Sequence, residues 1–226
     1  MDTKFKKIIS LLCVLVISGL TVADCGTCGA GAKHEHKEEK KACSSDCQKA
    51  CCATQTAPDF TLKDINGKAV QLSTLKGKTV VLEWTNYDCP FVKPHYDTEL
   101  KTMSNLAAKY AEQGVVWLTI NSTHYATVET NKAWVEKHQL KQAVLVDSDG
   151  KVGKLYQAKT TPHMFVIDKE GKIVYQGAID NAPLGKKPID QEQVNYVDKA
   201  LAELLADKKV EIAKTKPYGC SVKYAN

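Results

Sequence analysis

From Ala57 onward the sequence alternates short apolar runs with amphipathic stretches, whereas residues 24–56 are rich in lysine, glutamate, glycine, alanine and cysteine. The first pattern is typical of an α/β domain, in which helices cover a sheet of buried strands. The second contains too few large apolar side chains to form a core. We therefore predict one folded domain preceded by a disordered tether, within a chain of 226 residues.

The spacing of apolar residues predicts the strands and helices of this domain. Strands are predicted at residues 79–84, 115–121, 143–146, 163–168 and 173–178, and the last two form a hairpin around residues 169–172. Helices are predicted at residues 93–113, 127–139 and 191–206, and residues 147–150 predict a turn. This order predicts a central mixed sheet flanked by helices.

The first 23 residues have the pattern of a secretory signal peptide. A basic start is followed by an uncharged run over residues 8–20 and by Thr-Val-Ala, which ends at Ala23. The run is shorter than the ~20 residues that a membrane-spanning helix needs. We therefore expect export to the periplasm or cell envelope. Membrane attachment is expected only if Cys25 is lipidated, and the preceding Asp24 fits that processing poorly.

Nine cysteines occur, and Cys13 would leave with the signal peptide. Most of the others lie in the tether, together with two histidines. The tether residues that could hold copper or zinc are Cys25, Cys28, His34, His36, Cys43, Cys47, Cys51 and Cys52. Disulfides or a thiol-rich spacer are the alternatives. We expect no other cofactor to be required.

The charge of the chain also excludes some partners. The net charge is +5, and basic and acidic residues are spread over the whole sequence. No block of one sign appears, so a nucleic-acid partner is not expected. Every basic residue is lysine, so any anion must be bound by lysine, histidine or backbone N–H groups rather than by a guanidinium group.

Four segments carry a resemblance to a known group. They are APDFTLKDINGKAVQLSTLKGKTVVLEW from Ala57, the dipeptide Cys89-Pro90, the turn DSDGKVGKLY, and TTPHMFVID around Pro162. In this order they resemble the redoxin, or AhpC/TSA, group of the thioredoxin-fold superfamily over residues 57–206. Residues 207–226 would form a C-terminal extension. The resemblance implies a thioredoxin-like fold and a cis Pro162 that turns the Thr161 backbone toward an extended substrate beside Cys89.

Cys89 is the predicted reactive thiol. It lies between a predicted strand and a predicted helix, whose N-terminus would lower the pKa of the thiol. Lys93 and His95 are expected to add positive charge, and Asp88 to oppose them.

Near Cys89 the sequence differs from the active-site motif of each related family. Val92 stands where a thioredoxin has its second cysteine, and Thr85 where a copper chaperone of this fold has its first. Asn86 stands where a peroxiredoxin has threonine or serine, and the arginine of that family is absent. A second thiol must therefore come from Cys220 or from the tether.

These observations predict an exported thiol oxidoreductase with antioxidant or redox-homeostasis function. Cys89 would perform disulfide exchange or peroxide reduction, with disulfide exchange slightly favoured, and a thioredoxin-like partner would reduce the protein again. The predicted catalytic residues are Cys89, Cys220, Pro162, Thr161, Asn86 and Lys93. The alternatives are a copper or zinc carrier or sensor that uses the tether, and a non-catalytic module that binds a partner.

Overall fold

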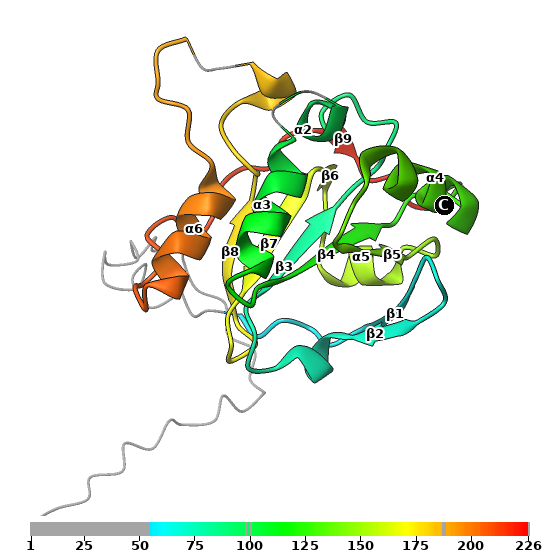
Figure 1. Cartoon of the computed structure of the whole chain (residues 1–226), viewed down its shortest axis with the longest axis horizontal. Helices are drawn as coiled ribbons and strands as arrows, with labels where there is room; N and C mark the ends of the chain where they lie inside the picture. The colour runs from blue at the N-terminus through cyan, green and yellow to red at the C-terminus, as the bar shows by residue number, and fades with distance from the viewer. Residues whose placement is uncertain (1–54, 98, 100, 187–188, 226) are drawn as a thin grey trace, which may run out of the picture. The chain divides into compact units, whose positions relative to one another are not determined.

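The computed structural model describes residues 55–97, 99, 101–186 and 189–225. A seven-stranded sheet lies at its centre (Figure 1), in the order β2 (Ala69–Gln71), β1 (Thr61–Asp64), β5 (Ala143–Val146), β4 (Val116–Asn121), β3 (Val80–Trp84), β7 (His163–Ile167), β8 (Ile173–Gly177). Strands β3, β4 and β5 are parallel, and the other pairs are antiparallel. This is the mixed sheet of a thioredoxin-like fold.

Among the described residues, five α-helices and two short 3₁₀ turns accompany the sheet. The helices are α2 (Pro94–Asp97), α3 (Thr102–Ala111), α4 (Val128–His138), α5 (Lys151–Leu155) and α6 (Tyr196–Leu205), and the turns are η1 (Leu72–Leu75) and η2 (Pro183–Gly185). Two of these helices, α4 and α6, begin at a side-chain cap. Thr127 and Thr130 form a reciprocal capping box on α4, and the Asn195 side chain accepts the Asp198 N–H at the start of α6.

The side chains of β3 alternate between two cores, one on each face of the sheet. Val81 packs with residues of α3, α4 and α6, including Met103, Trp134 and Leu201. Leu82 and Trp84 pack on the opposite face with residues of β1, β2, η1 and α5. The strand therefore ends between two filled layers, and the loop that follows it starts from a rigid support.

Most of the predicted elements are confirmed, with bounds shifted by one or two residues. The single helix expected over residues 93–113 is wrong, because α2 and α3 are separate. Lys101 precedes α3 with a φ of 39°, a left-handed conformation that a continuous helix excludes. Helix α6 begins at Tyr196 rather than at residue 191, since Asn195 caps it.

The end of the chain folds back over the domain. We call residues 213–225 the C-terminal strap. Its first residues bond to β8 through the Gln176 N–H to the Ala213 carbonyl and the Thr215 N–H to the Gln176 carbonyl. Further on, β9 (Cys220–Ser221) pairs antiparallel with β6 (Thr160–Thr161), and Figure 1 shows β9 beside the α2 end of the sheet. No helix among the described residues is long and apolar enough to cross a membrane.

Candidate active site

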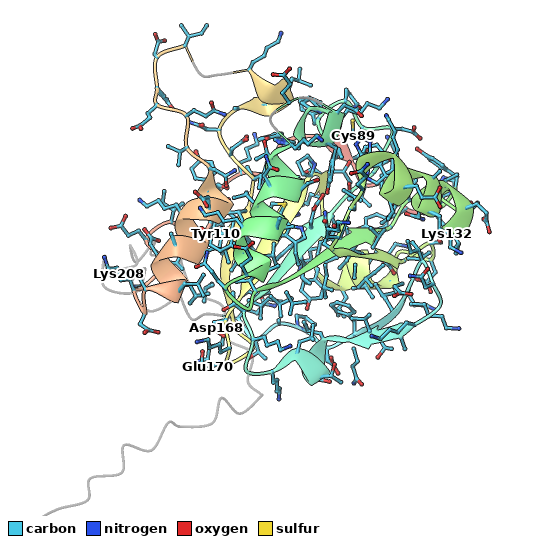
Figure 2. The ribbon with its side chains drawn as sticks, viewed as in Figure 1. Cys89, Tyr110, Lys132, Asp168, Glu170 and Lys208 are labelled. Atoms are coloured by element: carbon cyan, nitrogen blue, oxygen red, sulfur yellow. The ribbon has the colours of Figure 1, made fainter. Side chains whose placement is uncertain are left out.

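Cys89 lies in the turn that joins β3 to α2. Its N–H donates to the Asn86 carbonyl at 3.0 Å, and its carbonyl accepts the N–H groups of Val92 and Lys93. The side chain is 2% exposed. Figure 2 shows Cys89 at the α2 end of the sheet. The thiol is therefore held at a fixed place under the surface.

The loop between β6 and β7 supplies the first contact of this thiol. The Thr161–Pro162 peptide bond is cis, as the resemblance implies. The Cys89 Sγ donates to the Thr161 carbonyl at 3.0 Å. The Thr161 hydroxyl is buried and has no partner with hydrogen-bond geometry in the described part of the chain. It is therefore available to the ionised form of the Cys89 sulfur.

The C-terminal strap brings the second thiol to the same loop. In the β6–β9 ladder Cys220 lies opposite Thr161, the residue that accepts the Cys89 hydrogen bond. Both cysteines are free thiols, and Cys220 is partly exposed. The two thiols are close enough for each to influence the pKa of the other. The structure thus joins the predicted residues Cys89, Thr161, Pro162 and Cys220 in one site.

The pKa values of the two thiols are shifted in opposite directions. Burial raises the pKa of Cys89, but the nearby donor groups of the Thr161 side chain, of Cys220 and of the Phe91 backbone favour the ionised sulfur and outweigh burial, so the pKa is lowered. Burial and the interaction with Cys89 raise the pKa of Cys220 to about 11. Cys89 is therefore the more acidic thiol of the pair, and Cys220 is the less acidic one.

A shortage of space explains the glycine before Cys220. Gly219 has a φ of +127°, and a Cβ built on it would lie 2.1 Å from the Thr161 carbonyl oxygen. Any side chain would therefore push the strap away from the cis-proline loop. The Gly-Cys dipeptide is what allows β9 to lie this close to Cys89.

A polar cluster holds the strap beside Gly219. The Tyr218 hydroxyl donates to Asp180 Oδ1 at 2.6 Å and lies 3.1 Å from His95 Nε2. His95 belongs to α2, and Asp180 follows β8. Both side chains are buried. We name these three residues the Tyr218 cluster.

Three sequence expectations about the surroundings of Cys89 need correction or refinement. Helix α2 is only four residues long, so its dipole is small and the lowered pKa of Cys89 comes from hydrogen-bond donors. The prediction that His95 adds a positive charge is wrong at neutral pH, because burial lowers the pKa of its imidazole. Lys93 is exposed, and its backbone N–H rather than its side chain contacts Cys89.

Asn86 shapes the loop rather than pointing a donor at the sulfur. Its Oδ1 accepts the Asp88 N–H at 2.9 Å, and its Nδ2 lies 3.4 Å from the Tyr125 hydroxyl. Its backbone carbonyl accepts the Cys89 N–H. The predicted tether ligands, from Cys25 to Cys52, lie outside the described residues. Within the described residues no group of three or more His, Cys, Asp or Glu side chains gathers as metal ligands would.

The Tyr218 cluster and the buried Glu83 were not predicted from the sequence. Glu83 lies on β3 and accepts hydrogen bonds from Tyr96 at 2.6 Å, Trp117 at 2.8 Å and Thr119 at 3.2 Å. Burial raises the pKa of its carboxyl group. A single acid inside the run Val80–Trp84 is a signal that could have marked Glu83, whereas nothing in the sequence connects Asp180 with Tyr218.

Comparisons with known proteins agree with this geometry. Thiol-disulfide oxidoreductase ResA from Bacillus thuringiensis subsp. konkukian is 33% identical over 120 residues, which are 53% of this chain and 66% of the relative. The protein of the same name from Bacillus subtilis is 32% identical over 118 residues, 52% of this chain and 63% of the relative. The chain thus covers just under two thirds of the length of these relatives.

Two solved structures have similar folds. The hypothetical protein SMc02350 from Sinorhizobium meliloti has a TM-score of 0.67 and 27% identity, over 76% of this chain and 94% of that one. An uncharacterized conserved protein from Geobacillus kaustophilus has a TM-score of 0.68 and 28% identity, over 76% and 92%. The model of the AhpC/TSA family matches residues 53–176, more than half of the sequence. The chain therefore belongs to the AhpC/TSA family.

Proposed function

We propose that this protein is a thiol–disulfide oxidoreductase whose redox-active pair is Cys89 and Cys220. One observation carries the proposal: the strap sets Cys220 opposite Thr161, the residue whose carbonyl accepts the hydrogen bond of the Cys89 thiol. A low-pKa thiol beside a second free thiol is the arrangement that a dithiol–disulfide cycle needs. The printed name of the ResA relatives describes the same class of reaction.

The reaction has two exchange steps. The Cys89 thiolate attacks one sulfur of a substrate disulfide, forms a mixed disulfide and releases the first substrate thiolate. Cys220 then loses its proton and attacks the Cys89 sulfur, which releases the second thiolate and leaves a Cys89–Cys220 disulfide. Two electrons pass from the protein to the substrate, and an external thiol must return them.

The pKa of Cys220 changes between the two exchange steps in the direction that the second step requires. Its pKa is raised first by burial, and then by the hydrogen bond and the negative charge of Cys89. Formation of the mixed disulfide removes that charge and that acceptor. The pKa of Cys220 therefore falls when Cys220 has to become the nucleophile, while nearby Lys223 also lowers it.

Disulfide exchange is favoured over peroxide reduction by what surrounds the sulfur. A peroxide would convert the Cys89 thiolate to a sulfenic acid, and Cys220 would then form the disulfide with loss of water. The side chain of Asn86 is engaged in the loop, and the sequence contains no arginine. We also propose that the protein is exported, as the N-terminal sequence pattern supports.

Mapping the thiols after oxidation tests the proposal. The full chain is used with Cys13, Cys25, Cys28, Cys43, Cys47, Cys51 and Cys52 changed to serine, so that only Cys89 and Cys220 remain. One equivalent of a peptide disulfide should yield a Cys89–Cys220 disulfide and two equivalents of peptide thiol, as measured by mass spectrometry. The same chain is also treated with one equivalent of hydrogen peroxide. Failure to form the Cys89–Cys220 disulfide with either oxidant would refute the pair, and faster formation with hydrogen peroxide would identify a peroxidase instead.

The unsubstituted chain serves as the comparison. If the tether supplies the second thiol, the oxidised unsubstituted chain will contain a disulfide between Cys89 and a cysteine within residues 25–52. Removal of the tether cysteines will then slow the reaction. The proposal predicts instead that both chains form the Cys89–Cys220 disulfide at the same rate.

A further inference from the structure

Tyr218 connects the strap to the two segments that border the reactive thiol. It lies two residues before Cys220, and its hydroxyl sits between Asp180, at 2.6 Å, and His95, at 3.1 Å. Since the hydroxyl donates to Asp180, the His95 Nε2–H is the donor to Tyr218. One phenol thus makes two partly buried hydrogen bonds from the strap to the rest of the domain.

The same residue also packs against the turn that carries Cys89. The ring of Tyr218 lies 6.1 Å from that of Phe91, which follows Cys89 by two residues in this turn. His95 is the second residue of α2, the helix that follows this turn. The Tyr218 cluster therefore fixes the strap to the structure around Cys89 and not merely to the protein surface.

We propose that Tyr218 is a positioning residue that holds the strap closed, so that Cys220 both shields the Cys89 sulfur and stays within reach of it. The inference rests on the proposed Cys89–Cys220 pair. The Tyr218 hydroxyl then has opposite effects on the two exchange steps. A bulky disulfide reaches Cys89, which is 2% exposed, only when the strap opens. The second step, attack by Cys220, happens only when the strap is closed.

The variant Tyr218→Phe separates these effects, because it removes the hydroxyl and keeps the ring. The loss of hydrogen bonds to a charged and a polar group is expected to shift the opening equilibrium of the strap roughly tenfold. The first step should therefore become faster and the second slower, each by up to that factor. A general loss of stability would not change the two rates in opposite directions.

The assay uses 5,5′-dithiobis(2-nitrobenzoate), a bulky aromatic disulfide that releases a coloured thiolate at each step. It is applied to the full chain in which only Cys89 and Cys220 remain, and the two releases are timed by stopped flow. Tyr110→Phe is the matched control, because the Tyr110 hydroxyl also donates to an aspartate, Asp198, at 2.7 Å, but on α3, away from the strap. Figure 2 shows Tyr110 well apart from Cys89.

We expect Tyr218→Phe to speed the first release and slow the second, and Tyr110→Phe to leave both rates within twofold of the parent chain. Asp180→Asn, which keeps an acceptor but removes the charge, should act in the same directions by a smaller factor, and it serves as the test if Tyr218→Phe does not fold. Equal rates in parent and variant, or changes in one direction only, would overturn the positioning role. Release of one equivalent by the parent chain would refute the redox pair itself.

Discussion

Substituting Gly219 by alanine should uncouple the two thiols without removing either of them. The new Cβ would lie 2.1 Å from the Thr161 oxygen, 2.7 Å from the Thr161 carbonyl carbon and 3.2 Å from the Pro162 nitrogen. All three are backbone atoms of the loop before β7, which is paired with β3. The loop cannot give way easily, so the strap has to move.

The size of the movement follows from these distances. Contacts of a Cβ below 3.0 Å are essentially not found, so the strap must retreat by about 0.9 Å from the Thr161 oxygen. A misplacement of about 1 Å between reacting groups can cost about 100-fold in rate. We therefore expect Cys220 to attack the Cys89 mixed disulfide about 100-fold more slowly in Gly219→Ala.

The timed release of the two thiolates from the aromatic disulfide measures this rate. Gly171→Ala is the control, because Gly171 also has a positive φ, +82°, but no atom within 4 Å of the added Cβ. The control should lose some stability and keep its second release rate. A second release in Gly219→Ala within threefold of the parent chain would refute the claim that close contact with Thr161 sets the position of Cys220.

Three further predictions concern acidity and stability. Alkylation of Cys89 by iodoacetamide should rise with pH around a midpoint below the ordinary cysteine pKa, and Cys220→Ala should move that midpoint upward, because a hydrogen-bond donor is lost; an unchanged midpoint would contradict this. Because the pKa of Glu83 is raised in the fold, its contribution to stability is complete below about pH 4.5 and is lost as the pH rises through the folded pKa. Urea unfolding should therefore show Glu83→Gln gaining stability relative to the parent chain as pH increases, and no trend with pH would refute the assignment. Asp147→Ala should lower the free energy of unfolding by about 2 kcal/mol, since its carboxylate accepts the N–H groups of Val152 and Gly153 and the Ser122 hydroxyl hydrogen; a loss under 0.5 kcal/mol would contradict it.

The elements that the sequence predicted well are those with strong local signals. The run at residues 79–84 and the hairpin around residues 169–172 have apolar spacing and turn residues that leave few alternatives. The interruption before α3 had no such signal, because Lys101 is neither glycine nor proline. Its left-handed conformation, with a φ of 39°, is one that few residues other than glycine adopt.

The candidate site was predictable only in part, for a related reason. Cys89, Thr161 and Pro162 belong to motifs that keep their order along the chain, so a resemblance could place them. The pairing of β9 with β6 joins residues about 60 positions apart through a two-residue ladder, which no periodicity shows. The neutral state of His95 likewise depends on burial that only the folded chain creates.

The central claim, that Cys220 completes the reaction begun at Cys89, is tested most directly by Cys220→Ser. In the full chain with no other cysteine than Cys89, one equivalent of the aromatic disulfide should release a single thiolate, and mass spectrometry should find a stable mixed disulfide on Cys89. Release of two equivalents by this variant, or an adduct-free Cys89, would contradict the account.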